Sequence, residues 1–268
     1  MGDLPIHMIQ EEEWSQMFLL YDAAIKEIST KLEILNNEFK LSHQYNPIEH
    51  VTSRLKSMDS IARKLRKRNL ELTVANVMQN LNDIAGLRVI CSFSSDIYRI
   101  ANAIERQSDI KIIKIKDYIK EPKPNGYMSY HMIVSIPIFL SDRVIETKIE
   151  IQIRTIAMDF WASLEHKIYY KFEGNAPHGI RAELKECADI VAFLDKKMLS
   201  INEYVKEYSE KGSVSHMTVD TEDYDVINSE EDVVTVNAET VETDNSTTEE
   251  AHNMKQNKKA QKKRRLWR

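Results

Sequence analysis

Glycine is scarce in this sequence, and its spacing excludes two common kinds of phosphate site. The 268 residues contain six glycines, at positions 2, 86, 126, 174, 179 and 212. No two of them fit GxxxxGK or GxGxxG, the motifs in which backbone N–H groups surround phosphates. If this protein binds a nucleotide, side chains rather than a glycine-rich loop must hold the phosphates.

Cysteines and long apolar runs are also few. Cys91 and Cys187 are the only cysteines, too few for a disulfide framework or a zinc cluster. No segment approaches the ~18 apolar residues of a membrane span, and the N-terminus has no basic region followed by an apolar one, as a secretory signal requires. We therefore expect a cytoplasmic protein with no membrane partner.

Charge is unevenly distributed along the chain. The net charge is −5, so no overall basic field favours nucleic acid as a partner. Residues 220–250 contain twelve Asp or Glu and no Lys or Arg, whereas residues 255–268 contain eight Lys or Arg and no acid. We predict a folded domain with flanking helices over 1–212 and a disordered acidic-then-basic tail over 213–268. The basic end of that tail would suit contact with RNA, although nothing else in the sequence supports it.

The spacing of apolar residues predicts both helices and strands. Apolar residues three or four apart predict a long helix over 11–39, and Asn46-Pro47 predicts the start of a second, basic helix over 48–68. Strands are predicted at 84–93, 110–119, 131–140 and 148–155, and further helices at 96–106, 157–170 and 180–208. The order predicts an α+β fold, a mixed β-sheet flanked by helices with long helices at both ends of the domain.

The segment KIEIQIRT, residues 148–155, alternates apolar and polar side chains. Its isoleucines occupy one face of a strand, and Glu150, Gln152 and Arg154 occupy the other, roughly 6.5–7 Å apart. Such a row is either the solvated side of an antiparallel sheet or the floor of a site.

Several other residues have the chemistry of a nucleotide site. Asp83 precedes a buried strand, and together with Glu150 it offers two carboxylates, a set that suits Mg²⁺ when phosphates complete the shell. Tyr127 follows the Asn125-Gly126 turn and either stacks on a base or packs in the core. Asp159 lies on the next helix, where its carboxylate can accept from both N–H groups on the edge of a guanine.

Four segments together resemble the small alarmone synthetases, single-domain relatives of the RelA/SpoT synthetase domain that make (p)ppGpp. They are RLKSMDSIARK, NDIAGLRV, KDYIKEPKPNGYMSYH and EIQIRTIAMDFWASLEHK. The resemblance extends from about residue 21 to residue 205 and is closer to the RelP type than to the RelQ type. It implies a nucleotidyltransferase-like fold and a homotetramer. The implied reaction is a Mg²⁺-dependent, synthesis-only transfer of the β,γ-pyrophosphoryl group of ATP to the 3′-hydroxyl of GTP or GDP.

The resemblance also implies roles for individual residues. Glu150 would be the catalytic carboxylate, drawing the proton from the acceptor hydroxyl and binding Mg²⁺ together with Asp83. The residues expected to hold ATP are Arg54, Lys56, Ser60, Lys64, Arg66 and Arg88. The residues expected around the acceptor nucleotide are Lys123, Tyr127, His131, Gln152 and Asp159, with Tyr127 stacking on guanine. In this interpretation the polar row of residues 148–155 is the floor of the site.

Two positions depart from the family pattern, and two other functions compete with synthesis. Met128 stands where many relatives have Arg, which would remove a phosphate contact, and Lys116 stands where some have Arg.

One competing function is that of toxin-type relatives, which pyrophosphorylate the 3′ end of tRNA. The other is a non-catalytic nucleotide- or RNA-binding regulator, which would be expected to lack Glu150 or Asp83, and both are present.

Overall fold

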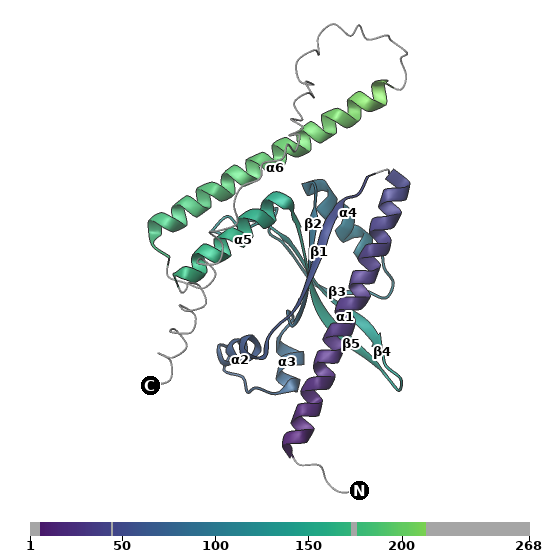
Figure 1. Ribbon diagram of the computed structural model, residues 1–268, viewed down its shortest axis with the longest axis vertical. Coiled ribbons are helices and arrows are strands. Elements are labelled where there is room, and N and C mark those ends of the chain that lie inside the picture. The colour runs from purple at the N-terminus through teal and green to yellow at the C-terminus, as the bar shows by residue number, and fades with distance from the viewer. Residues whose placement is uncertain (1–5, 44, 173–175, 213–268) are drawn as a thin grey trace, which may run out of the picture. The chain divides into compact units, whose positions relative to one another are not determined.

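The computed structural model describes residues 6–43, 45–172 and 176–212 (Figure 1). The chain divides into two units, residues 1–216 and 217–268, and only the first contains described residues. The tail predicted over 213–268 therefore lies outside the described residues and stays a prediction. No helix in the described ranges is both long enough and apolar enough to cross a membrane.

Six helices and five strands are described. In chain order they are α1 (Ile6–His43), β1 (Ile48–Leu55), α2 (Met58–Arg66), α3 (Val74–Asn80), β2 (Ala85–Cys91), α4 (Ser94–Glu105), β3 (Lys111–Asp117), β4 (Tyr130–Phe139), β5 (Val144–Thr155), α5 (Ile156–Lys171) and α6 (His178–Gly212). The strands form one sheet in the order β1-β2-β5-β4-β3. β2 and β5 are parallel, and the other neighbouring pairs are antiparallel. The predicted α+β fold with a mixed sheet is confirmed.

The predicted basic helix over 48–68 is wrong in its first half. Residues 48–55 form β1, an edge strand that pairs antiparallel with β2, and only residues 58–66 are helical. Val51 and Thr52 are β-branched and favour a strand, and the unpaired edge of β2 supplies the hydrogen-bond partners. Arg54 is thus a strand residue, and Lys56 follows the strand, where its backbone N–H donates to the carbonyl of Ile84 at 2.8 Å.

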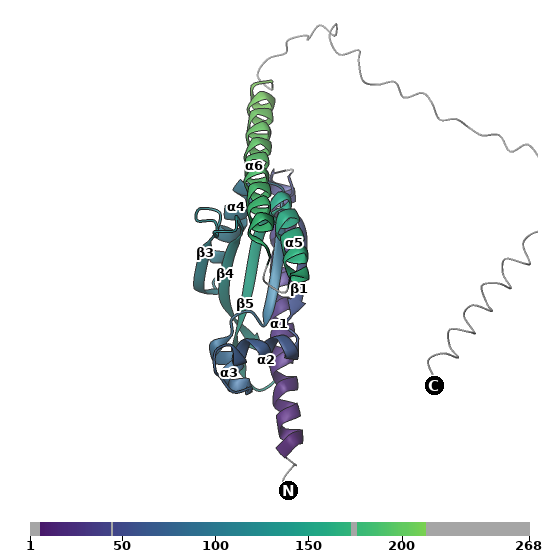
Figure 2. The ribbon, with the colours of Figure 1, turned by 90° about the vertical axis from the view of Figure 1, so that its left-hand side faces the viewer.

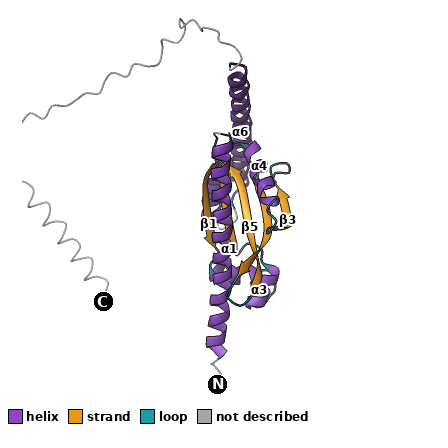
Figure 3. Cartoon of the chain, turned by 90° about the vertical axis from the view of Figure 1, so that its right-hand side faces the viewer, coloured by secondary structure: helices purple, strands orange, loops and turns teal. Residues whose placement is uncertain are grey.

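One face of the sheet carries the core. Three isoleucines of β5, Ile149, Ile151 and Ile153, are fully buried and belong to one apolar cluster with residues of α1 and α4. Figure 3 shows α1 lying along this face. Since successive strand residues point to opposite faces, Glu150, Gln152 and Arg154 project from the other one.

The other helices lie near the two ends of the strands. α2 and α3 lie beyond one end, and α5 and α6 lie near the other (Figures 1 and 2). Trp161 of α5 donates its indole N–H to the carbonyl of Leu184 of α6 at 2.8 Å, which joins these two helices. The polar face of the sheet is consequently bordered by α2 at one end and by α5 at the other.

Candidate functional site

Two rows of aligned residues cross all five strands. From β1 to β3 the first row is Thr52, Arg88, Gln152, His131 and Lys116. The second row is Arg54, Gly86, Glu150, Ile133 and Lys114. Residues directly opposite one another in neighbouring strands project to the same face. The sheet therefore brings residues predicted for ATP, for the acceptor and for catalysis onto one surface, opposite the core.

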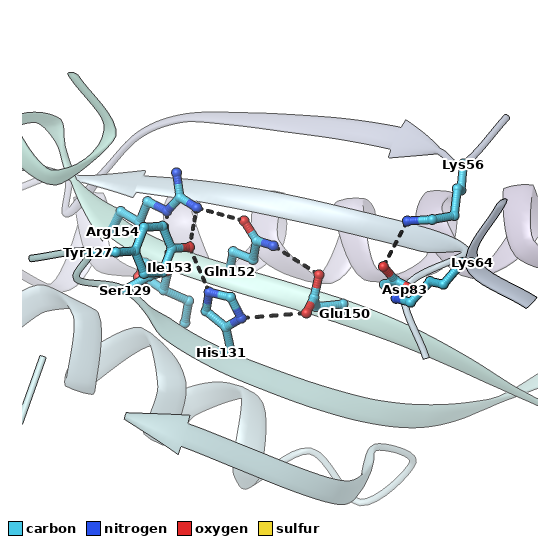
Figure 4. Close-up of polar contacts among 10 residues, drawn as sticks. All are labelled: Lys56, Lys64, Asp83, Tyr127, Ser129, His131, Glu150, Gln152, Ile153 and Arg154. Carbon is cyan, nitrogen blue, oxygen red and sulfur yellow. Dashed lines mark hydrogen bonds and ion pairs between the residues drawn. The ribbon is translucent and has the colours of Figure 1, made fainter. Parts of the chain in front are cut away.

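A cluster of two lysines and one carboxylate lies at the end of this surface nearest α2. Lys56 Nζ lies 2.8 Å from Asp83 Oδ2, and Lys64 Nζ of α2 lies 2.6 Å from Asp83 Oδ1 (Figure 4). Burial by itself would raise the pKa of Asp83, but the hydrogen bonds and charges of the two lysines outweigh it. The pKa of this carboxyl therefore lies below its ordinary value, so Asp83 is ionised near neutral pH.

Glu150 lies at the centre of the surface and has two partners. Gln152 Nε2 donates to Glu150 Oε2 at 2.9 Å, and His131 Nδ1 lies 3.5 Å from Glu150 Oε1. Burial would raise the pKa of Glu150, but contacts with His131 and Gln152 bring it below its ordinary value. Burial lowers the pKa of His131, which Glu150 only partly offsets. At neutral pH the arrangement is an ionised carboxylate beside a neutral imidazole, so Glu150 is able to accept a proton.

Tyr127 lies at the other end of the surface. Its hydroxyl is 2.9 Å from His131 Nε2, and its ring lies under two cations, Lys123 Nζ at 4.6 Å and Arg154 Cζ at 5.0 Å from the centroid. The edge of Tyr118 contacts the same ring, with centroids 6.0 Å apart. Tyr127 is half-buried and belongs to the polar surface, although it also packs against the apolar cluster that contains Trp161. The side chain can therefore pack against the protein and still present part of its ring to a ligand.

Asp159 of α5 joins two arginines from neighbouring strands. Arg88 Nη1 lies 3.2 Å from Asp159 Oδ1, and Arg154 Nη1 lies 3.1 Å from the same oxygen. Arg88 Nε is buried and has no hydrogen-bond acceptor within the described ranges. An unsatisfied buried N–H is costly, so a ligand oxygen at this position would be stabilised.

Two adjoining hollows lie over the polar surface. One of about 480 Å³ is lined by Arg54, Arg88, Tyr127, Gln152, Arg154, Ala162, Ser163, Glu165, His166 and Lys167. A smaller one of about 160 Å³ is lined by Thr52, Ser53, Arg54, Gly86, Leu87, Arg88 and Gln152. Arg54, Arg88 and Gln152 line both. Hollows of a few hundred Å³ with basic walls suit anionic ligands of nucleotide size.

Comparison with known proteins decides the family. Residues 53–175 match the model of the region found in RelA / SpoT proteins. The chain is also 50% identical over 194 residues to the GTP pyrophosphokinase YwaC of Bacillus subtilis, a match that covers 72% of this chain and 92% of the relative. This chain belongs to the RelA/SpoT family.

Solved structures of small alarmone synthetases have the same fold. The structure of small alarmone synthetase 2 from Bacillus subtilis is 47% identical with a TM-score of 0.66, covering 72% of this chain and 99% of that chain. Small alarmone synthetase 1 from the same organism, bound to its product pppGpp, is 34% identical with a TM-score of 0.67, covering 72% and 98%. The family and fold predictions are both confirmed.

Two of the residues predicted from the RelA/SpoT resemblance, Ser60 and Arg66, lie on α2, which borders the polar surface, and a third, Lys123, contacts that surface through the Tyr127 ring. Ser60 Oγ contacts Ser57 and Arg63 of its own segment, at 3.0 and 3.3 Å, and Arg66 is exposed at the end of α2. Lys123 is exposed but lies over the Tyr127 ring. The roles of these three residues, like those of all the other predicted site residues, stay proposals.

Met128 lies away from the polar surface. It lines a separate hollow of about 220 Å³ with residues such as Gly126, Met158 and Asp195. Its placement does not support the interpretation that it replaces a phosphate contact in this RelA/SpoT relative. Lys116, by contrast, is exposed on the edge strand β3 and aligned with His131.

Sequence reasoning missed Arg154 as a site residue. Its only signal was its place after Glu150 and Gln152 in the alternating row, and no role was assigned to it. In the structure its guanidinium is buried and contacts Tyr127, Gln152 and Asp159.

The carboxylates fit a magnesium ion in their donor chemistry. Asp83 and Glu150 are close enough for the charge of Asp83 to oppose ionisation of Glu150. Mg²⁺ prefers oxygen ligands and is commonly held by one or two carboxylates together with substrate phosphates and water. No group of three or more His, Cys, Asp or Glu that could hold a metal gathers among the residues described. An ion here would take its remaining ligands from phosphates and water.

Proposed function

We propose that this chain is a GTP pyrophosphokinase that transfers the β,γ-pyrophosphoryl group of ATP to the 3′-hydroxyl of GTP or GDP. The observation that carries the proposal is the single polar surface on which Glu150, the lysine–Asp83 cluster and Tyr127 lie together. Two relatives support it. YwaC is a GTP pyrophosphokinase, and the structure of small alarmone synthetase 1 holds its product pppGpp. The products are AMP and ppGpp or pppGpp.

ATP occupies the basic end of the surface. Arg54 and Arg88 line the hollows, and Lys56 and Lys64 contact Asp83 at the end of the surface nearest α2. A triphosphate requires cations because no glycine-rich loop is present, and Lys and Arg stabilise the negative charge on the transferring oxygens. Ser60 and Arg66 extend this set along α2.

Asp83 and Glu150 would hold Mg²⁺. When bound, the ion neutralises charge on the phosphate oxygens of ATP. Lys56 and Lys64 contact Asp83, and both ammonium groups would be close enough to this carboxylate to contact phosphate oxygens of a nucleotide held there.

The guanine nucleotide occupies the end of the surface near α5. Tyr127 stacks on the base, and Asp159 accepts from its N–H groups, while Lys123, His131 and Gln152 surround the rest of the nucleotide. The contacts of Arg88 and Arg154 with Asp159 fall on Oδ1, so Oδ2 is the oxygen that would accept from a base edge.

Glu150 acts as the general base. It accepts the proton of the ribose 3′-hydroxyl as that oxygen attacks the β-phosphorus of ATP. The new bond joins the 3′-oxygen to phosphorus, the bond from the β-phosphorus to the α–β bridging oxygen breaks, and AMP leaves. In-line positioning and charge stabilisation supply most of the catalysis in such transfers.

The assembly is a homotetramer in which α6 contributes contacts. Large apolar residues of α6 are exposed in the single chain, among them Ile190 (60%), Phe193 (71%), Tyr204 (68%) and Tyr208 (72%). Monomeric proteins rarely expose extended apolar patches, so another surface is expected to cover this helix. The cytoplasmic location predicted from the sequence stays a prediction.

The test uses purified protein, Mg²⁺ and ATP labelled in its β- and γ-phosphates, with GDP, GTP or deacylated tRNA in parallel reactions. Label on a guanine nucleotide is the expected result. Label on tRNA alone would replace the proposal with the toxin-type activity, and label on none of them would favour the non-catalytic regulator.

A further inference from the structure

Arg154 is the most highly connected buried charge on the polar surface. Its side chain is 5% exposed, and all three guanidinium nitrogens make contacts. Nε donates to Ser129 Oγ at 3.2 Å, Nη1 donates to Asp159 Oδ1 at 3.1 Å, and Nη2 donates to Gln152 Oε1 at 3.0 Å and to the hydroxyl of Tyr127. Figure 4 shows the contacts from the segment before β4 and from β5. Asp159 adds a contact from α5.

Two chains of hydrogen-bond partners run from this guanidinium to Glu150. In one, Gln152 accepts from Arg154 with its amide oxygen and donates to Glu150 with its amide nitrogen. In the other, the Tyr127 hydroxyl accepts from Arg154 and is hydrogen-bonded to His131 Nε2, and His131 Nδ1 faces Glu150. Arg donates and never accepts, so the amide oxygen of Gln152 faces Arg154 and the amide nitrogen faces Glu150. One cation thereby orients the amide of Gln152 and holds the hydroxyl of Tyr127 beside His131.

Stability alone is a weak reason for this arrangement. Removing a guanidinium from water is costly, and a buried ion pair often adds little net stability. Among the residues that the structure describes, one carboxylate contacts the Arg154 guanidinium, that of Asp159, and it is shared with Arg88. The partners Tyr127, Gln152 and Asp159 are instead three of the five residues proposed to receive the guanine nucleotide.

We propose that Arg154 is a positioning residue for the acceptor nucleotide. Its rigid fork of donors holds Tyr127, Gln152 and Asp159 in place before the nucleotide arrives. This ordering lowers the cost of binding the acceptor more than the cost of binding ATP, because most of the ordered partners belong to the acceptor end of the surface. The inference rests on the proposed function, because it takes the acceptor to be a guanine nucleotide.

The test compares Arg154→Met and Arg154→Lys with wild type, measuring kcat and the KM for each substrate in turn. Arg154→Met should raise the KM for GTP about tenfold or more and change the KM for ATP by less than about twofold. Arg154→Lys keeps the charge beside Asp159 and should recover thermal stability, but its single ammonium should leave the KM for GTP raised. Arg143→Met, an exposed arginine in the β4–β5 turn, serves as the control.

A double-mutant cycle separates positioning from a general loss of folding. Tyr127→Phe keeps the ring but removes the hydroxyl that contacts Arg154, and it should raise the KM for GTP several-fold in wild type. In the Arg154→Met background it should add little, because the contact is already lost. Additive effects, or equal increases in KM for both substrates, would overturn the positioning role.

A direct measurement of GDP binding tests the positioning role of Arg154 separately from the proposed transfer reaction. Calorimetry with GDP measures acceptor affinity whether or not transfer occurs. If wild type binds GDP but transfers nothing, the proposed function fails, and weaker GDP binding by Arg154→Met would still support positioning. If wild type neither transfers label nor binds GDP, both proposals fail.

Discussion

At the scale of single residues, the polar surface works because neighbours set the charge state of each group. Burial favours the neutral forms of Glu150 and His131. Contacts with His131 and Gln152 nevertheless bring the pKa of Glu150 below its ordinary value, whereas at His131 burial outweighs the effect of Glu150 and keeps the ring neutral. The lysines in contact with Asp83 lower the pKa of that carboxyl in the same way. Burial and local contacts together therefore prepare two carboxylates and a neutral histidine at neutral pH.

Replacing Glu150 by Gln tests the general base. Gln has almost the same shape and can still accept from Gln152, so the fold should persist while the proton acceptor is lost. We expect kcat to fall by about 10²-fold or more, measured as label transfer to GTP. Glu146→Gln, four residues earlier on the same face of β5, should change kcat by less than about twofold. Near-normal turnover of Glu150→Gln would refute the catalytic role.

The lowered pKa of His131 predicts how the free energy of unfolding depends on pH. Its pKa is lowered in the folded state by burial, so below about 6.5 the unfolded chain binds a proton that the folded chain does not. The free energy of unfolding should therefore fall as the pH drops below about 6.5, by at most about 1.4 kcal/mol per pH unit for this group. Denaturant titrations between about pH 7.5 and 5.5 measure this slope, over a range where most carboxylates stay ionised.

The control for this slope is a second histidine. His131→Gln should flatten the pH dependence, whereas His166→Gln, at an exposed position on α5, should leave it unchanged. Equal slopes in wild type and His131→Gln would show that His131 does not contribute to the pH dependence.

At the scale of elements, α5 and α6 hold the loop that carries Tyr127. The turn closes through the N–H of Gly126, which donates to the carbonyl of Lys123 at 2.8 Å. Asn125 Nδ2 donates to Glu165 Oε1 of α5 at 3.1 Å. Gly126 has a φ of +88°, and a Cβ there would overlap the Cβ of Ala188 of α6. The proposed acceptor loop is thus packed directly against the helix whose apolar face is exposed.

Gly126→Ala should disturb this loop. The positive φ and the contact with Ala188 should together cost about 2 kcal/mol or more of unfolding free energy. The KM for GTP should rise more than the KM for ATP, because Tyr127 is the next residue. Gly179→Ala is the matched control, since nothing lies within 4 Å of a Cβ at that position of α6. Equal stability of the two variants would contradict the packing argument.

At the scale of the whole molecule, the exposed apolar residues of α6 predict self-association. Substituting Phe193 and Tyr204 with Glu should place charges in the proposed interface and break the tetramer into smaller species. Sedimentation velocity measures the outcome. Phe139→Glu, an exposed phenylalanine of β4, is the control and should leave the assembly intact. A wild type that sediments as a monomer would contradict the prediction.

Local pattern was enough to predict much of this protein. The alternation in residues 148–155 placed the isoleucines in the core and Glu150 and Gln152 on the other face, because a strand has a period of two. The shortage of glycine predicted that Lys and Arg side chains would hold the phosphates of a nucleotide. Around the polar surface the structure places four such side chains, those of Arg54, Lys56, Lys64 and Arg88. The family motifs added the likeness to alarmone synthetases.

Tertiary structure decided what local pattern left ambiguous. Residues 48–55 have polar and apolar residues that suit either a helix or a strand, and pairing with the edge of β2 made them β1. The role of Arg154 depends on Ser129, Tyr127 and Asp159, which lie on other elements and reach it only after the chain folds. The sequence determines which side chains a strand presents to each face, because that depends on neighbours along the chain. Which side chains meet across the sheet depends on distant segments, and so it is determined only by the fold.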